Sequence, residues 1–339
     1  MSPCAPARRL RLNGAYSYGP RQIAISVWKP RAPVIFIFAT APHRYTHESV
    51  EAEASVDVKV LGYPDLIQSP NMPQATYVFT DVDRLAPATL VHVAEIYRKL
   101  RDGGGKVLND PARMLSRFGL LRALHRAGIN AFDAYRIEEL EQPRRWPVFL
   151  RVEGTHTPPV SGLLEDQAEL DAAVERAVAD GSPRSQMLIV EYAAEPVQPG
   201  LFRKLSAFRI GDRLLGYTCV HDDQWLVKYG KPAIATPELY EEEYRFVAEC
   251  PFADVLRTAF EIAGVEYGRV DYGLVDGRPQ IYEINSNPDL KLRPEPGPVA
   301  RRNESNALFT ANYLDALKAI DTPGTKAERR SLAGASRQA

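Results

Sequence analysis

The pattern of apolar and polar positions predicts an α/β protein that begins with a small parallel sheet. Residues 34–39 and 77–80 are apolar runs of buried-strand length, and residues 56–61 alternate between apolar and polar side chains. Residues 90–100 instead repeat apolar side chains at helical spacing, and three consecutive glycines end that helix before a short strand at 106–109. This strand–helix–strand order predicts a ligand crevice at the carboxyl ends of the strands.

A second helix is predicted to follow directly. Asp110 is suited to cap its first turn, and Pro111 to its first position. Its apolar face is formed by Met114, Phe118, Leu121 and Leu124, and Gly128 ends it. The remaining predicted elements are strands at 147–153 and 186–192, a hairpin over 201–221 that turns at Gly211–Asp212, and helices at 237–250, 252–264 and 303–320.

The most informative polar residues lie on a further predicted hairpin, near the C-terminal end. Asp271 lies on its first strand, and Glu283, Asn285 and Asn287 lie at the end of its second, with an Asp-Gly turn signal at 276–277. Two carboxylates and two carboxamides on a half-buried hairpin are costly unless a cation satisfies them. Oxygen ligands of this kind suit Mg²⁺ or Mn²⁺ rather than zinc.

The number of residues in the turn decides whether these side chains meet. Glu283 and Asn285 are two positions apart and share one face of a strand. Asp271 lies opposite Glu283 only if the loop has an odd number of residues or a bulge intervenes. We therefore predict a three-residue loop at 276–278. The alternative is a solvated strand edge in which Arg269 caps Asp271.

The pattern Asp…Glu-x-Asn-x-Asn-Pro resembles the metal and phosphate signature of the ATP-grasp superfamily, closest in style to its glutathione-synthetase-like carboxylate–amine ligases. The resemblance implies that Asp271 and Glu283 hold two Mg²⁺ ions, or Mn²⁺, against the β- and γ-phosphates of ATP. It implies that Asn285 completes the second metal site and that Asn287 lies near the transferred phosphate. The implied fold class is α/β, with an N-terminal α/β (pre-ATP-grasp) domain followed by a two-subdomain ATP-grasp fold.

The resemblance covers about residues 105–320 and implies a division of the chain. The expected parts are a substrate-side α/β domain, a first ATP-grasp subdomain with a phosphate lid, a second with the metal site, and a tail. Their ranges are 1–110, 111–190, 191–320 and 321–339. The tail is polar and rich in Gly, Ser, Lys and Arg, which predicts disorder.

The same resemblance assigns phosphate contacts to basic residues. Arg117, where the family usually has lysine on this helix, and Arg151, mid-strand, are the candidates for the α-phosphate side. Arg151 supplies a permanent charge and a bidentate fork, whereas Arg117 is equally well explained as a solvated residue. Lys204 is the candidate contact to the γ-phosphate. Many relatives have Asp-x-Arg near this point, so Ser206 marks an arginine that is missing here.

The expected adenine linker and the expected lid each lie at the end of a predicted strand. Glu191, Tyr192 and Ala193 match the linker that hydrogen-bonds adenine through its backbone. The predicted lid after residue 153 is poor in glycine and contains two prolines, so its mode of phosphate cover departs from the family pattern. His156 in this lid either replaces a backbone contact or is simply exposed.

Residues for the substrates are less clearly marked. Arg293, with Arg301 and Arg302, is suited to orient an acidic substrate bidentately, although helix capping or solvent exposure explains these residues too. A polar group after the first strand is a candidate substrate site, because a crevice is expected there. Its members are His43, Arg44, Tyr45 and His47.

Composition narrows the class of protein. With 339 residues, 45% hydrophobic and 25% charged, the chain has ordinary globular composition and is long enough for two or three compact units. A net charge of −1 predicts neither nucleic acid nor membrane as a partner. The three cysteines are far apart and form no CxxC pair, which indicates neither a disulfide framework nor structural zinc and favours the cytoplasm. No apolar run reaches the roughly 18 residues of a membrane span.

Together these observations predict an ATP- and Mg²⁺-dependent carboxylate–amine ligase. A small-molecule or peptide carboxylate is expected to attack ATP, and an amine is expected to attack the resulting acylphosphate to form an amide or peptide bond. One alternative is an ATP-grasp-type kinase that stops at a phosphorylated small molecule. Another is a non-catalytic nucleotide-binding module. The oligomeric state is left open, with a homodimer as one option.

Overall fold

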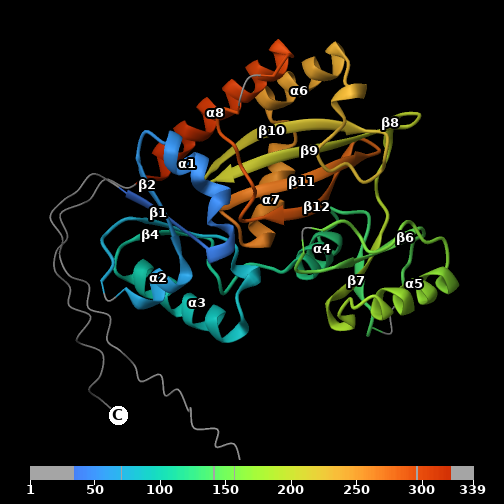
Figure 1. Cartoon of the computed structure of the whole chain (residues 1–339), viewed down its shortest axis with the longest axis horizontal. Helices are drawn as coiled ribbons and strands as arrows, with labels where there is room; N and C mark the ends of the chain where they lie inside the picture. Colours follow the sequence, from blue (N-terminus) through green and yellow to red (C-terminus); the bar gives the residue numbers. More distant parts are fainter. Residues whose placement is uncertain (1–33, 70, 140–141, 156, 295–296, 322–339) are drawn as a thin grey trace, which may run out of the picture.

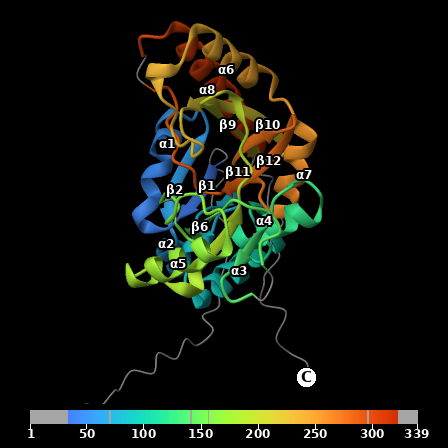
Figure 2. The same ribbon diagram turned by 90° about the vertical axis from the view of Figure 1, so that its right-hand side faces the viewer.

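The computed structural model describes residues 34–69, 71–139, 142–155, 157–294 and 297–321, and these form three sheets with helices packed around them (Figures 1 and 2). The predicted tail, apart from Asp321, lies outside the described residues. No helix in the described ranges is long and apolar enough to cross a membrane.

The first sheet is the predicted parallel sheet. Its four strands have the order β2-β1-β3-β4 and are β1 (Val34–Ala39), β2 (Asp57–Gly62), β3 (Thr76–Phe79) and β4 (Lys106–Leu108). The strand between Lys106 and Leu108 ends one residue earlier than predicted. Its helices are α1 (Glu48–Glu53), α2 (Tyr63–Gln68) and α3 (Pro87–Asp102), with 3-10 turns η1 (Ala41–His47) and η2 (Val82–Arg84). The carboxyl ends of β1 and β3 run into η1 and η2, where a crevice is expected.

The second sheet is antiparallel and small, in the order β5-β7-β6. Its strands are β5 (Ala134–Arg136), β6 (Val148–Val152) and β7 (Met187–Glu191), with helices α4 (Arg117–Arg126) and α5 (Gln167–Ala179) and the turn η3 (Arg184–Gln186). Figure 1 shows β6, β7 and α5 at one end of the molecule. Helix α5 is missing from the sequence-based prediction, although its buried residues have helical spacing: Leu170, Ala173, Val174 and Ala177.

The predicted start of the helix at Asp110 is wrong. Helix α4 begins at Arg117, and Ser116 caps it by accepting a hydrogen bond from the Gly119 N–H. The Asp110 carboxylate instead accepts from the Ala112 N–H in a turn (3.0 Å). The Leu115 N–H donates to the Ala263 carbonyl (3.0 Å), which fixes this segment in a non-helical conformation.

The third sheet carries the predicted metal hairpin. It runs β10-β9-β11-β12, with β8 on β9, and all its pairings are antiparallel. Its elements are β8 (Pro196–Gln198), β9 (Leu201–Ile210), β10 (Arg213–Asp222), η4 (Pro232–Ile234), α6 (Pro237–Glu249), α7 (Ala253–Ala263), β11 (Tyr267–Val275), β12 (Arg278–Asn285) and α8 (Ala300–Ile320). Helices α6 and α8 pack together over β10, whereas α7 contacts β12 and α4 (Figure 1).

The largest hydrophobic core joins the first sheet to the third. Ile35 and Ile37 of β1 belong to the same cluster of buried side chains as Phe208 of β9 and Tyr272 of β11. The second sheet instead has a core of its own beneath α5. Burial of apolar surface, which contributes roughly 25 cal/mol per Å², therefore ties the first and third sheets more directly to each other than to the second.

Candidate nucleotide and metal site

A cavity of about 950 Å³ is lined by residues of the second and third sheets, of the loops near them, and of the turns η1 and η2. This size is in the range of small-molecule and cofactor sites, roughly 300–1,000 Å³. The lining residues include His43, Thr46 and Arg84 from the first part of the chain. The middle of the chain contributes Phe149, Arg151 and Tyr192. The last part contributes Lys204, Trp225, Asp271, Glu283, Asn285 and Asn287.

Asp271 and Glu283 lie directly opposite each other on β11 and β12, which confirms the predicted juxtaposition. The predicted three-residue loop is wrong. Val275 pairs with Arg278, so the loop has two residues, and both have positive φ (Asp276 50°, Gly277 71°). A bulge, and not the turn, brings the two carboxylates onto one face, because Asp271 pairs with Glu283 but the next residue of β11 pairs with Ile281.

The bulge leaves Tyr282 unpaired in the ladder, and its side chain has a partner elsewhere. The Tyr282 hydroxyl donates to the Ala193 carbonyl (3.0 Å), and Tyr282 lines the cavity. Glu283, Asp271, Ser206 and Thr218 are cross-strand neighbours in turn, and their side chains form a row on one face of the sheet. Sequence reasoning could not find this row, since it depends on two bulges, the second at the Gly216–Thr218 irregularity of β10.

Both carboxylates already have arginine partners. Arg269 forms a bidentate pair with Asp271 (Nε–Oδ1 2.8 Å, Nη2–Oδ2 3.1 Å), as the alternative interpretation of the sequence expects. Arg117 forms an ion pair with Glu283. Lys204 Nζ lies 3.6 Å from Asp271 Oδ2. These contacts show that the two hairpin carboxylates pair with cations of β9, β11 and α4.

The two asparagines have different surroundings. Asn285 Oδ1 accepts from the Asn287 N–H (2.8 Å), which holds the end of β12 in a tight turn. Asn287 Oδ1 accepts from the Thr46 and Thr80 hydroxyls (2.9 and 3.2 Å), so its oxygen faces the first part of the chain. Both residues line the cavity. The donor set of two carboxylates and one amide oxygen on one face fits Mg²⁺.

Arg151 and Lys204 bring positive charge to opposite walls of the cavity. Arg151 Nε is buried without a hydrogen-bond partner. Burial, followed by repulsion from Arg117, lowers the pKa of the Arg151 guanidinium to about 10. Lys204 Nζ donates to the Lys228 carbonyl (2.7 Å). A buried cation that lacks a strong partner is expected where an anion binds.

Arg117 does not line the cavity, unlike Arg151. Its Nη1 donates to the carbonyls of Glu153, the last residue of the predicted strand, and Thr155, in the predicted lid (3.1 and 3.0 Å). Arg117 therefore links Glu283 of the hairpin to the backbone of the lid. His156, the other lid residue considered, lies outside the described residues.

The predicted adenine linker lies at one end of the cavity. The Glu191 side chain is turned into the protein, where it accepts from the Asp133 N–H and the Tyr135 hydroxyl (3.0 and 2.9 Å). Tyr192 and Ala193 line the cavity. The Ala193 carbonyl accepts from Tyr282, and the Tyr192 N–H donates to Pro147.

An aromatic slot beside this linker is absent from the sequence-based prediction. The Trp225 ring lies 5.1 Å from that of Phe149 and 5.6 Å from that of Tyr192, measured between centroids. Phe149 lies on β6, Tyr192 follows β7, and Trp225 belongs to the loop at 222–230. Residues this far apart in sequence carry no joint signal until the fold brings them together. The Trp225 ring is tilted by 50° to Phe149 and by 80° to Tyr192, and an apolar group of rings that lines a cavity in this way suits contact with a purine ring.

Of the three arginines predicted to orient an acidic substrate, one lines the cavity and two do not. Arg293 is exposed and pairs with Glu53 (2.9 Å), and it does not line the cavity. Arg301 pairs with Glu241 on the outer surface of α6. Arg302 alone of the three lines the cavity, where it also pairs with a buried glutamate of α6 (3.1 Å).

The structure also brings together Cys219, His221 and Glu242, whose possible ligand atoms lie within 4.8 Å of one another. Cys219 and His221 lie on the face of β10 that packs against α6. Arg203 donates to Glu242, so this carboxylate already has a cationic partner. The cluster is best explained as a buried ion-pair network.

Comparisons with known proteins identify the fold. No family model and no curated protein matches the chain. D-alanine–D-alanine ligase from Bacillus anthracis superposes with a TM-score of 0.51 at 12% identity, over 86% of this chain and 97% of that one. The ATP-grasp ligase PsnB, in complex with a phosphomimetic variant of its minimal precursor, Mg and ADP, gives a TM-score of 0.50 at 14% identity, over 88% and 100%. The chain has an ATP-grasp fold.

The predicted fold class is therefore confirmed: an N-terminal α/β domain is followed by a two-subdomain ATP-grasp fold. The first sheet precedes the second and third sheets in the chain, in the order that this fold class predicts. The cavity is lined by residues of the second and third sheets and by His43, Thr46 and Arg84.

Proposed function

We propose that the chain is an ATP- and Mg²⁺-dependent carboxylate–amine ligase that acts through an acylphosphate. The observation that carries this proposal is the pairing of Asp271 with Glu283 on one face of the β11–β12 hairpin, inside a cavity that also exposes Arg151 and Lys204. The similar solved structures whose names are ligases support it. In this scheme residues 1–110 shape the substrate side, 111–190 carry the lid and 191–320 carry the metal ligands.

The nucleotide fits the cavity in one direction. Phe149, Tyr192 and Trp225 contact the adenine at one end of the cavity, and the Tyr192–Ala193 backbone lies beside its edge. Arg151 and Lys204 then bind phosphate oxygens by charge-assisted hydrogen bonds. Asp271, Glu283 and Asn285 would hold the two Mg²⁺ ions, or Mn²⁺, which neutralise the triphosphate when bound.

The chemistry requires positioning and exclusion of water more than covalent participation by the protein. A substrate carboxylate held near Asn287 is in a position to attack the γ-phosphorus, with Lys204 neutralising the charge that develops. The lid and the loop at 222–230 protect the acylphosphate from water. Arg117 positions the lid because it holds the Glu153 and Thr155 carbonyls.

A non-catalytic nucleotide-binding module is the second candidate. The observation that favours it is the pairing of both hairpin carboxylates with arginines, since these pairs satisfy Asp271 and Glu283 without metal. The two candidates differ in how nucleotide binding depends on Mg²⁺ and in whether ATP is consumed.

The decisive experiment measures thermal stabilisation by ATP with and without Mg²⁺, in the natural protein and in Glu283→Gln. We expect Mg²⁺-dependent stabilisation of the natural protein, about 2.7 kcal/mol at a ligand concentration of roughly 100 Kd, and loss of the Mg²⁺-dependent part in the variant. The control is Glu261→Gln on the exposed face of α7. Stabilisation that needs no metal, or that Glu283→Gln leaves unchanged, would refute the metal site.

Turnover then separates a ligase from a kinase. Release of ADP and phosphate together with an amide, only when both a carboxylate and an amine are present, is expected of the ligase. A stable phosphorylated product that forms without any amine would identify a kinase. Nucleotide binding without turnover of any candidate pair would favour the binding module.

A further inference from the structure

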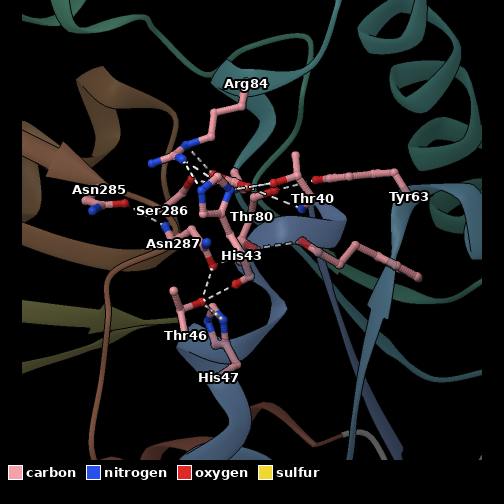
Figure 3. Close-up of polar contacts among 12 residues, drawn as sticks. Thr40, His43, Thr46, His47, Tyr63, Thr80, Arg84, Asn285, Ser286 and Asn287 are labelled. Atoms are coloured by element: carbon pink, nitrogen blue, oxygen red, sulfur yellow. Dashed lines mark hydrogen bonds and ion pairs between the residues drawn. The ribbon is translucent and has the colours of Figure 1, made fainter. Parts of the chain in front are cut away.

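A polar cluster at the carboxyl end of the first sheet surrounds the carboxylate of Asp81. Figure 3 labels its members Thr40, His43 and Arg84. Asp81 is 1% exposed and has a left-handed backbone (φ 59°) between β3 and η2. Its oxygens are approached by the Thr40 N–H (3.2 Å), the Thr40 hydroxyl, His43 Nδ1 (3.1 Å) and Arg84 Nε (2.8 Å). A carboxylate with this many donors is rigidly placed.

The contacts of His43 Nδ1 with Thr40 and Asp81 favour one tautomer of the ring. The single hydrogen of the Thr40 hydroxyl is donated to Asp81 Oδ2, so this hydroxyl is only an acceptor toward His43 Nδ1 (2.7 Å). Asp81 Oδ2 is also only an acceptor. Nδ1 therefore carries a hydrogen, and in the neutral ring Nε2 carries the lone pair.

Arg84 lies against the same ring. Its Nη1 lies 2.5 Å from His43 Nε2 and 3.1 Å from Nδ1, so it lies beside the ring and not on the line of the Nε2 lone pair. Arg84 Nε is buried and close to Asp81, yet makes no hydrogen bond of good geometry. Within the described part of the chain, Nη2 of Arg84 makes no hydrogen bond. The guanidinium is thus held by charge and is able to turn toward a second anion.

The cluster borders the end of the metal hairpin. The Asp81 N–H donates to the Ser286 hydroxyl (3.1 Å), and Ser286 lies between Asn285 and Asn287. His43 and Arg84 both line the cavity, next to Thr46, which holds Asn287 (Figure 3). His43 is the one histidine among the described residues that line this cavity. Imidazole is the side chain best suited to accept a proton near neutral pH.

We propose that His43 is the proton acceptor for the attacking amine and that the amine substrate carries an anionic group, such as a carboxylate, that binds Arg84. The proposal rests on the ligase function. When the anion draws the Arg84 guanidinium toward it, a positive charge moves away from His43 Nε2. Asp81 is the positioning residue that fixes the tautomer and stabilises the imidazolium that forms.

The proton and bond changes balance as follows. The substrate ammonium gives one proton to His43 Nε2, and the free amine attacks the acyl carbon of the acylphosphate. The carbon–oxygen bond to phosphate breaks, and the leaving phosphate takes the second proton of the nitrogen. The products are the amide and inorganic phosphate, and His43 then returns its proton to solvent. No oxidant, reductant or further reactant is needed.

The test compares two nucleophiles in the natural protein and in His43→Gln. Hydroxylamine is largely uncharged at neutral pH and attacks acylphosphates without a base, so it traps the intermediate as a hydroxamate. A panel of the common amino acids and dicarboxylates, with ATP and Mg²⁺, first identifies the carboxylate that gives the most ATP-dependent hydroxamate. The same panel then serves as amines for the ligation assay.

We expect His43→Gln to lower kcat for ligation about 100-fold, at the lower end of general-base effects, while hydroxamate formation changes less than about threefold. Its ligation rate should rise with pH in step with the free amine. The charged and titratable groups that face His43 are Asp81, Arg84 and Tyr45. Arg84→Met should raise KM for the amine at least tenfold and leave the hydroxamate assay unchanged. His92→Gln, on the exposed face of α3, is the matched control.

The two hypotheses fail in different ways. If the natural protein forms no hydroxamate with any carboxylate, the ligase function is overturned, and the role of His43 with it. If it forms hydroxamate but His43→Gln lowers both reactions equally, the ligase function stands and the proton-acceptor role is refuted. Unchanged ligation in His43→Gln, or an unchanged KM for the amine in Arg84→Met, would also refute the proposal.

Discussion

Arg151 is the residue whose environment is hardest to explain by stability alone. Its Nε is buried without a hydrogen-bond partner, and Arg117 lies close enough to lower its pKa further. Its neighbour on the same strand, Phe149, forms part of the aromatic slot. Because the pKa of Arg151 remains near 10, the guanidinium is charged at neutral pH, and the folded protein bears the cost of burying it.

We therefore predict that Arg151→Met weakens nucleotide binding and does not destabilise the protein. Loss of one charge-assisted contact, about 1.5–3 kcal/mol, corresponds to roughly ten- to hundredfold weaker ADP binding. Calorimetry measures the affinity, and urea unfolding without nucleotide is expected to show equal or greater stability. Arg151→Lys, which keeps the charge, should lie between. In the natural protein, ADP affinity should fall as the pH rises toward 10 and the guanidinium loses its charge. A variant that is unstable yet binds ADP normally would show a structural role.

At the scale of elements, the third sheet depends on the close approach of α6 to β10. Gly216 has no side chain, and a Cβ there would meet the Phe246 carbonyl and lie 2.9 Å from the Val247 Cα, both backbone atoms of α6. The following bulge directs Tyr217 onto Phe309 of α8, with ring centroids 4.5 Å apart. The hairpin and the helices were predicted from periodicity, whereas this contact depends on their packing.

Gly216→Ala is expected to destabilise the protein by about 1–3 kcal/mol, because α6 must move to accommodate a methyl group against its backbone. Gly162→Ala is the control, since a Cβ at Gly162 would meet nothing within 4 Å. Chemical denaturation measures both. A change of less than about 0.5 kcal/mol in Gly216→Ala would mean that α6 shifts at little cost.

For the whole molecule, the distribution of the cores decides which parts move together. The first and third sheets share one cluster of buried side chains, which includes Ile37 and Phe208. The second sheet has a core of its own that includes Leu150 and Met187. The second sheet also carries the lid and one wall of the aromatic slot. A unit with its own core and fewer shared contacts is expected to open separately.

Hydrogen exchange at low denaturant should show this difference. Amides of β6 and β7 are expected to exchange through a local opening of lower free energy than those of β1 and β11, which should exchange together. ADP with Mg²⁺ should slow exchange in β6, β7 and the loop at 222–230 most, because the nucleotide bridges them to the third sheet. Uniform exchange in all three sheets would contradict the separate opening.

The sequence by itself determined most strands and helices, because apolar periodicity reports directly which face of an element is buried. It also determined the oxygen-rich set of Asp271, Glu283, Asn285 and Asn287, since these residues are close together in the chain. Only the tertiary structure decided what surrounds that set. The bulge at Tyr282, the pairing of Arg117 with Glu283, the aromatic slot around Trp225 and the contact of His43 with Arg84 all join distant residues. Local pattern carries no information about such contacts, because their energy arises only when separate elements pack.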